Sequence, residues 1–326
     1  MQTVRRAVID VGTNSIKLLV ADVAGHDVRP VLEGSTQTRL GQGLYETHRL
    51  QPQAIAQTAA IVAAFAALAL KQNVSALRVV ATSAARDAKN SDELRAALER
   101  VTSLKLEIIS GEQEAEWVFR GVTTDPVLAG LPLLILDVGG GSTEFILGSG
   151  ERTHFQQSYS LGTVRLMEKL PHSDPPVAAE LARCRQWLGD FLDREVRPEL
   201  DPALRREAKK DSPERGLRVR DCETVQLVGT GGTTSILACM EARLKHFDRA
   251  RIEATRLSWD QVRAQTEHLW QLPLPERKKL IGLPPDRADV ILYGVAIYEA
   301  MMERFGFAEL RVSTRGLRFG VVMESL

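Results

Sequence analysis

Two stretches of this sequence, "VIDVGTNSIKLLVADV" at residues 8–23 and "LILDVGGGSTEFILG" at residues 134–148, share one pattern. In each, an apolar run leads into Asp-Val-Gly, two small or polar residues, a Ser and a second apolar run. The pattern predicts a strand, a tight turn and another strand. Asp10 and Asp137 lie 127 positions apart, about one domain length. We therefore interpret the repeat as a duplication of one α/β unit.

The sequence around both copies alternates short β-branched runs with Ala- and Leu-rich helical runs. In the first unit the patterns predict strands at 4–11, 16–22, within 28–38, 77–81 and 105–109, and helices at 52–72, 91–102 and 111–121. In the second unit they predict a strand at 153–160 and helices at 162–169, 176–197, 258–270 and 286–304, with a last strand and helix near the C-terminus. Residues 201–221 have few apolar side chains and many charges, which predicts a mobile surface insertion.

The bulk composition narrows the function classes. Of the 326 residues, 42 are Lys or Arg and 42 are Asp or Glu. A dedicated nucleic-acid binder is more often globally basic, so no nucleic-acid partner is expected. The longest apolar stretch, residues 59–70, has 12 residues, whereas a bilayer span needs about 20. We predict a buried helix there, no membrane partner, and a cytoplasmic location, because a strand pattern also begins at once where a signal peptide would lie.

Three glycine-rich turns follow apolar strand patterns, at residues 10–15, 137–142 and 228–234. Without a Cβ, the backbone can approach phosphate oxygens closely, and the N–H groups of the turn point into the gap. Any one of these turns alone could be an ordinary tight hairpin turn. Neither the P-loop pattern nor the dinucleotide-binding fingerprint is present. The three together favour a phosphate-binding site.

Carboxylates lie at two of these turns. Asp10 and Asp137 each end a strand just before the glycine, and Glu144 lies across the second hairpin from Asp137. Hard divalent cations such as Mg²⁺ prefer carboxylate and water oxygens and often bridge to substrate phosphates. The alternative is that Glu144 is an exposed strand residue.

The segment "GEQEAE" carries Glu112, Glu114 and Glu116 between the two units. On a helix, residues 112 and 116 share a face and residue 114 points elsewhere. One of these carboxylates could orient water toward a phosphoryl group as a general base. Spacing alone also fits a solvated acidic helix start, which the helix dipole favours.

Four basic side chains lie in or near these loops: Lys17, Arg86, Arg315 and Arg318. Arg can hold phosphate with two parallel hydrogen bonds. Each one alone is more often a surface charge.

Together these motifs resemble the exopolyphosphatase / guanosine pentaphosphate phosphohydrolase (Ppx/GppA) family of the actin, Hsp70 and sugar-kinase superfamily. The matching pieces run in family order between residues 7 and 322: "AVIDVGTNSIKLLVADV", "VVATSAARDAKN", "IISGEQEAEWVFRGV", "LILDVGGGSTEFILG", "YSLGTVRL", "LVGTGGTTSILA", "RADVILYGVAIYEAMMERFG" and "VSTRGLRFGVV". The resemblance implies an α/β fold of two duplicated actin-like (ribonuclease H-like) domains around a central cleft. It places domain I at 1–120 with 314–326 and domain II at 121–313, in the short, two-domain form.

Site residues carry over by position. The resemblance implies Glu114 as the catalytic residue and Asp137 and Glu144 as Mg²⁺ ligands, with Asp10 as a third candidate. Mn²⁺ is an alternative metal, and a monovalent cation is an additional candidate. The implied phosphate-binding residues are Thr13, Asn14, Ser15, Arg86, Gly139, Gly140, Gly141, Ser142, Gly231, Gly232 and Thr233. Phe319 stands where the family usually has an acid, so we assign it no role.

The resemblance implies Mg²⁺-dependent hydrolysis of the terminal phosphoanhydride bond of inorganic polyphosphate. Guanosine pentaphosphate is the alternative substrate, because motifs for the two activities overlap. A nucleotide- or polyphosphate-sensing module without turnover is an alternative of another class, although Glu114, Asp137 and Glu144 argue against it. Family members often dimerise, so a homodimer is a candidate assembly.

Overall fold

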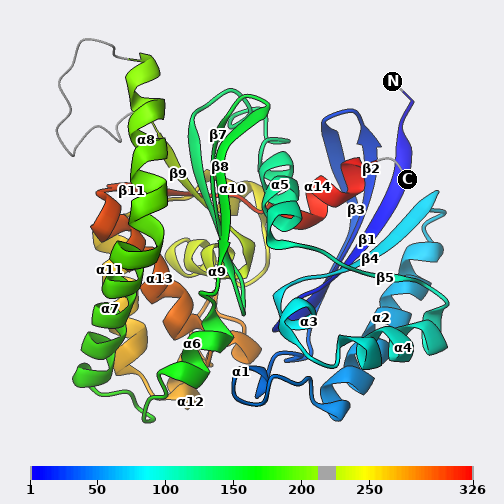
Figure 1. Ribbon diagram of the computed structural model, residues 1–326, viewed down its shortest axis with the longest axis horizontal. Coiled ribbons are helices and arrows are strands. Elements are labelled where there is room, and N and C mark those ends of the chain that lie inside the picture. The colour runs from blue at the N-terminus through cyan, green and yellow to red at the C-terminus, as the bar shows by residue number, and fades with distance from the viewer. Residues whose placement is uncertain (1, 212–224, 325–326) are drawn as a thin grey trace.

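The computed structural model describes residues 2–211 and 225–324. Within these residues the strands form a five-stranded sheet with the order β3-β2-β1-β4-β5 and a six-stranded sheet with the order β10-β11-β9-β6-β7-β8. The two sheets lie next to each other with helices between and outside them (Figure 1).

Both sheets are built around the same strand arrangement. The first consists of β1 (Val4–Val11), β2 (Ser15–Ala24), β3 (Asp27–Gln37), β4 (Ala76–Ala81) and β5 (Leu106–Ile108). The second consists of β6 (Leu133–Val138), β7 (Thr143–Ser149), β8 (Arg152–Tyr159), β9 (Gln226–Thr230), β10 (Arg256–Ser258) and β11 (Glu309–Val312). Strand β1 pairs antiparallel with β2 and parallel with β4, and β6 pairs antiparallel with β7 and parallel with β9. The predicted duplicated actin-like α/β fold is confirmed.

Helices cover the outer face of each sheet. The first unit has α1 (Leu44–Thr47), α2 (Pro52–Leu70), α3 (Ser83–Asp87) and α4 (Ser91–Thr102). The second has α6 (Thr163–Lys169), α7 (Ala178–Phe191), the π-helix η1 (Leu192–Val196), α8 (Arg197–Asp211), α9 (Gly231–Glu241), α10 (Arg249–Ala254), α11 (Trp259–Gln271), α12 (Leu274–Arg277), the 3₁₀-helix η3 (Pro285–Arg287) and α13 (Ile291–Phe305). Helices α5 (Gly111–Val122) and α14 (Leu317–Met323) lie between the sheets (Figure 1).

Helix α2 is long and apolar enough to cross a membrane by length and composition, but 39% of its most apolar window is buried inside the protein. Its buried side includes Val62 and Phe65, which pack in the core of the first sheet. Leu68 and Leu70 are exposed. The predicted burial of residues 59–70 therefore applies to one face of the helix only.

The alternation of side chains along the central strands positions the acidic residues. In β1, Ile9 and Val11 pack under the outer helices, whereas Val8 packs against the middle layer formed by α5 and α14. Successive residues of a strand point to opposite faces, so Asp10 shares the inner face with Val8. In β6, Ile135 faces the middle layer by the same alternation, and so does Asp137. Both aspartates thus lie on the faces that the two sheets turn toward each other.

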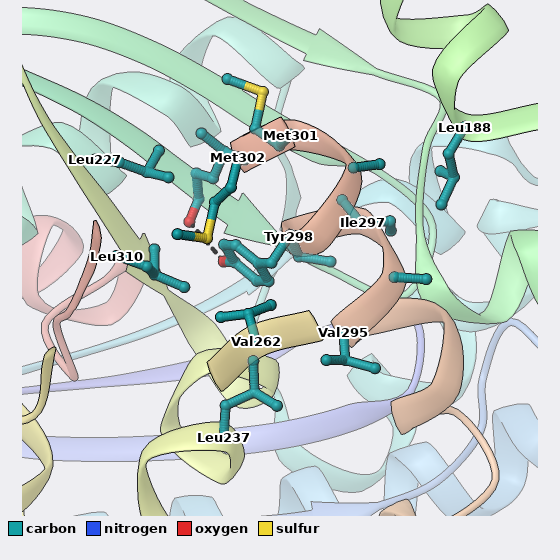
Figure 2. Packing of buried hydrophobic residues seen from close by; sticks show 14 of the residues in the cluster. Leu188, Leu227, Leu237, Val262, Val295, Ile297, Tyr298, Met301, Met302 and Leu310 are labelled. Carbon is teal, nitrogen blue, oxygen red and sulfur yellow. Dashed lines mark hydrogen bonds between the residues drawn. The ribbon is translucent and has the colours of Figure 1, made fainter. Parts of the chain in front are cut away.

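The core of the second unit supports the strand ends beneath the site. Figure 2 shows Tyr298 of α13 packed among apolar side chains that include Leu237 and Val262. Its hydroxyl donates to the carbonyl of Leu136 at 3.0 Å and lies 3.3 Å from that of Thr230. These two carbonyls directly precede Asp137 and Gly231, respectively. One buried hydroxyl therefore joins the two strand ends that carry site residues.

The prediction of a mobile insertion at 201–221 is wrong for its first half. Residues 201–211 belong to α8, which continues from α7 through η1. Leu200, Ala203 and Leu204 are buried in the core of the second unit. The few apolar residues of this segment fall at the i, i+3 and i+4 spacing of one helix face, so a low overall hydrophobicity still yields a packed helix. Residues 212–221 lie outside the described part of the chain.

Candidate active site

A cleft of about 630 Å³ lies between the two units, and all three glycine-rich turns line it. The sequence-predicted residues found in its lining are Asp10, Thr13, Asn14, Ser15, Glu114, Asp137, Gly139, Gly140, Gly141, Ser142, Glu144, Gly231, Gly232 and Thr233. The structure therefore brings together residues from both units and from the helix between them. Arg86 is placed differently, in a smaller neighbouring pocket.

The first two turns have the same backbone. The N–H of Gly12 donates to the carbonyl of Ser15 at 3.0 Å, and the N–H of Gly139 donates to that of Ser142 at 3.0 Å. The tips of these two hairpins nearly touch, since a Cβ on Gly140 would lie 2.8 Å from the Cβ of Thr13. Glycine at 140 thus permits the two units to approach at this point.

The residues opposite the two aspartates differ. Asp10 pairs across its hairpin with Lys17, whereas Asp137 pairs with Glu144. Burial raises the pKa of Asp10, and the positive charges of Lys17 and Arg318 oppose the rise. Burial likewise lowers the pKa of Lys17. The first hairpin therefore holds a pair of opposite charges and the second holds a pair of like charges.

The acid pair of the second hairpin is desolvated. Burial raises the pKa of Asp137 to about 6. Burial and the neighbouring Asp137 raise the pKa of Glu144 to about 7, while a hydrogen bond from the Ser158 hydroxyl to Glu144 Oε1 at 2.7 Å opposes the rise. Two carboxylates in such a place repel each other, and a bound cation would relieve that repulsion.

Glu114 enters the cleft from the first turn of α5. The Ser110 side chain caps this helix by accepting from the N–H of Gln113, as the Ser-x-x-Gln pattern predicts. Glu114 is 7% exposed. Burial and the negative charge of Glu144 raise its pKa well above the usual range, and Arg86 opposes the rise. A carboxylate with a raised pKa is suited to accept a proton near neutral pH.

Glu114 is also held in place. Its Oε2 lies 3.1 Å from Nη1 of Arg86, which in turn donates to the carbonyl of Ile109 at 2.9 Å. Arg86, which lines the smaller pocket, thus orients the carboxylate of Glu114.

The donor set fits a hard divalent cation bound partly through water and substrate. Within residues 2–211 and 225–324, no group of three or more His, Cys, Asp or Glu side chains could enclose a metal. Asp10 Oδ1 is buried and has no hydrogen-bond partner among the described residues, so a ligand oxygen is available. A few carboxylates completed by water and phosphate oxygens are the ligands typical of Mg²⁺.

The third turn completes the floor of the cleft. Gly231 has a φ of 89°, and a Cβ there would press on Oδ1 of Asp137. Only glycine adopts this conformation at no steric cost, which places the start of α9 directly beside Asp137.

Several site features could not be read from the sequence motifs. Lys17, a candidate phosphate clamp, lines the cleft and lies across the first hairpin from Asp10. Counting residues outward from the turn would have paired them, as it did for Asp137 and Glu144. Ser158 gave no signal, because its contact with Glu144 depends on the pairing of β7 with β8.

The two basic residues near the C-terminus, Arg315 and Arg318, lie in different surroundings. Arg318 lines the cleft and donates to the carbonyl of Leu18 at 2.7 Å. Arg315 instead forms an ion pair with Glu253, with 3.4 Å between its Nε and the Oε1 of the acid. Phe319 is 1% exposed, and the guanidinium groups of Arg249 and Arg315 lie 5.1 and 5.8 Å from its ring centre. At the position where the family usually has an acid, the Phe319 ring therefore contacts two guanidinium groups through cation–π interactions.

The sequence and the fold of this chain are similar to those of known proteins. The profile of the Ppx/GppA phosphatase family matches residues 19–326. Exopolyphosphatase 2 of Mycobacterium tuberculosis is 35% identical, with 99% of each chain aligned, and exopolyphosphatase 1 of Mycobacterium bovis is 26% identical over 99% of this chain and 88% of its own. The structure of the Aquifex aeolicus PPX-GPPA enzyme superposes with a TM-score of 0.76 at 29% identity, covering 99% of this chain and 100% of that one.

Proposed function

The chain belongs to the Ppx/GppA phosphatase family, and from this premise we propose that it is an exopolyphosphatase. It is a phosphoanhydride hydrolase that removes the terminal phosphate of inorganic polyphosphate. The observation that carries this proposal is the buried Glu114 carboxylate in a cleft formed by three glycine-rich turns. Phosphoryl transfer to water requires a base that orients the water and groups that bind the phosphate and its metal ion. Glu114, the backbone N–H groups of the turns and the nearby carboxylates can serve these roles.

In the proposed reaction, Glu114 accepts a proton from a water molecule while the oxygen of that water attacks the terminal phosphorus atom. The bridging P–O bond breaks, and its electron pair remains on the oxygen of the shortened chain. The products are one orthophosphate ion and a chain shorter by one phosphate. The proton passes from Glu114 to solvent, which restores the base.

We include Mg²⁺ in the proposal, with Mn²⁺ as the alternative and a monovalent cation as an addition. Asp137 and Glu144 would hold the divalent ion, and Asp10 would contribute through its unpaired oxygen. When bound, such a cation neutralises negative charge on the phosphoryl group. The raised pKa values of the two acids support this assignment.

We favour inorganic polyphosphate over guanosine pentaphosphate as the substrate, because the M. tuberculosis and M. bovis relatives are named exopolyphosphatases. The Gly-rich turns would bind phosphate through backbone N–H groups, with the side chains of Thr13, Asn14 and Ser15 as additional contacts. Cytoplasmic location and assembly as a homodimer remain predictions.

The test is phosphate release from short polyphosphate, long polyphosphate, guanosine pentaphosphate and ATP, with and without Mg²⁺. We expect release from polyphosphate that requires Mg²⁺. Glu114→Gln removes the base but keeps the shape, so turnover should fall by roughly 100-fold or more. Glu112→Gln, in the same helical turn but exposed, is the matched control and should retain activity.

Two results would contradict the proposal. Near wild-type turnover by the Glu114→Gln protein would remove Glu114 from the mechanism. Binding of polyphosphate without release from any substrate would favour the sensing module instead.

A further inference from the structure

Helix α6 of the second unit contacts α1 of the first unit, near the lower edge of the view in Figure 1. The function proposed above gives this contact no task. We call its four polar or aromatic participants, Gly43, Tyr45, Arg165 and Glu168, the α1–α6 clasp. We propose that the α1–α6 clasp sets the spacing between the two glycine-rich hairpins, which makes Tyr45 and Glu168 positioning residues for substrate binding. The kinetic part of this inference rests on the proposed function, and its structural part does not.

The carboxylate of Glu168 binds the main chain of the first unit. Its Oε1 accepts from the N–H of Gly43 at 2.7 Å, and its Oε2 accepts from the N–H of Tyr45 at 3.1 Å. Hydrogen bonds to an ionised carboxylate are stronger than those between neutral groups, and Glu168 is half-buried. Because both donors belong to the backbone, one carboxylate fixes a segment of the first unit to α6.

Tyr45 extends the clasp to the tip of the second hairpin. The Arg165 guanidinium lies 3.9 Å from the centre of the Tyr45 ring, and its Nε donates to the carbonyl of Gly141 at 2.8 Å. The Tyr45 hydroxyl approaches Gly141 so closely that a Cβ at that glycine would collide with it. Arg165 also pairs with Asp87 of α3 at 2.6 Å. The clasp therefore joins the first unit to the residue next to the hairpin contact at Gly140.

A different kind of contact joins the two units around α5 and α14. Leu19 of the first sheet and Ile135 of the second share one buried apolar cluster with Val118 of α5 and Leu317 of α14. The clasp consists of a few polar contacts, each of which contributes far less than a buried apolar cluster. Removing one carboxylate should therefore loosen the units at the clasp and leave the α5–α14 layer intact.

The spacing of the hairpins bears on binding because turns from both units line one cleft. Phosphoryl transfer depends chiefly on positioning. If fewer molecules have the competent spacing, the apparent dissociation constant rises by the inverse of that fraction. Polymer at saturation contacts both hairpins and restores the spacing. Loss of the clasp should thus raise KM and leave kcat nearly constant.

Steady-state kinetics with tripolyphosphate test this split. Glu168→Ala removes both acceptors, so KM should rise about tenfold while kcat changes by less than about twofold. Tyr45→Ala should act in the same direction, and Tyr45→Phe, which keeps the ring against Arg165, should recover most of the loss. Glu46→Ala changes an exposed residue next to Tyr45 and is the matched control, with the KM of the wild type. A contact that only stabilises the fold would lower the urea midpoint without this split.

Hydrogen exchange followed by mass spectrometry gives a readout that needs no catalysis. In the ligand-free Glu168→Ala protein, the amides of residues 10–15, 43–47 and 137–142 should exchange faster than in the wild type. The amides of α14 should exchange at the wild-type rate. Tripolyphosphate should reverse the difference at both hairpins, measured in the Glu114→Gln background so that the ligand is not consumed.

Three results would overturn the inference: an unchanged KM for Glu168→Ala, a fall in kcat as large as the fall in kcat/KM, or exchange that is faster in α14 as well. If Glu168→Ala does not fold, Glu168→Gln takes its place, because it keeps the size of the side chain and loses the charge; its KM should rise about threefold. Faster exchange at the clasp and hairpins without phosphate release from any substrate would support the clasp and contradict the proposed function alone.

Discussion

The hairpins of residues 10–15 and 137–142 close with the same backbone hydrogen bond but differ in the charges that they carry. Each closes with an N–H to carbonyl bond of 3.0 Å from the glycine to the serine, and each carries an aspartate on the face toward the cleft. Across from that aspartate lies Lys17 in the first hairpin and Glu144 in the second. One residue in each hairpin therefore makes the difference. Lys17 balances the charge of Asp10, whereas Glu144 adds a second acid beside Asp137 that suits a cation.

The difference teaches how a duplicated unit can specialise. In the first hairpin, the lysine offsets the charge of the desolvated aspartate, which favours the folded state. In the second, no such partner is present across the strand, and the pKa values of Asp137 and Glu144 rise to about 6 and about 7. We expect substitutions in the second hairpin to affect chiefly activity and those in the first to affect chiefly stability.

The sharpest way to break the comparison is Glu144→Lys, which gives the second hairpin the charge pattern of the first. A lysine beside Asp137 would neutralise the proposed cation site, so kcat/KM for Mg²⁺-dependent phosphate release should fall by roughly 1000-fold. Midpoint urea concentration should change little, because the new pair has opposite charges. Glu116→Lys, an exposed acid of α5, serves as the control. Retained Mg²⁺-dependent turnover in Glu144→Lys would show that the acid pair is not the metal site.

The reciprocal change, Lys17→Met, leaves Asp10 without its partner. The protein should lose about 2 kcal/mol of unfolding free energy, less than the roughly 3–5 kcal/mol for breaking a fully buried pair, because Lys17 is only half-buried. Urea denaturation measures this, with the exposed Lys71→Met as the control. The double substitution Asp10→Asn with Lys17→Met should be less destabilised than Lys17→Met alone. Equal losses in the two proteins would mean that Lys17 acts independently of Asp10.

The smallest effect concerns the contact between the hairpin tips. Gly140→Ala would bring a methyl group within 2.8 Å of the Thr13 Cβ, and the resulting strain should cost about 1 kcal/mol in unfolding free energy. At Gly232 an added Cβ meets nothing within 4 Å, so Gly232→Ala should leave the unfolding free energy nearly unchanged. If both substitutions cost the same, the tips do not press on each other in solution.

Much of the fold could be predicted because its signals are local. The apolar runs at residues 4–11 and 133–138 and the turns that follow them define two hairpins without reference to the rest of the chain. Hairpin pairing then placed Glu144 opposite Asp137. The helix at 201–211 was not predicted, because the many charged residues of this segment indicated a mobile insertion and its few apolar residues gave only a weak helical pattern.

The environment of the site residues could not be predicted, because it depends on packing between distant segments. Nothing local to "ATSAARDAKN" indicates that Arg86 contacts Glu114. Nothing in the helical pattern of residues 286–304 indicates that the Tyr298 hydroxyl contacts the carbonyls of Leu136 and Thr230. These contacts join elements separated by 28 and 162 positions.

The packing of α14 has a consequence for how the protein is made. Leu317, Val321 and Val322 of this helix share a cluster with Val8 and Leu19 of the first sheet, and the Arg6 side chain donates to the carbonyls of residues 322–324. During synthesis, β1 leaves the ribosome long before α14 does. The inner face of the first sheet therefore stays uncovered by α14 until that helix has been synthesised, and β1 reaches these contacts only then.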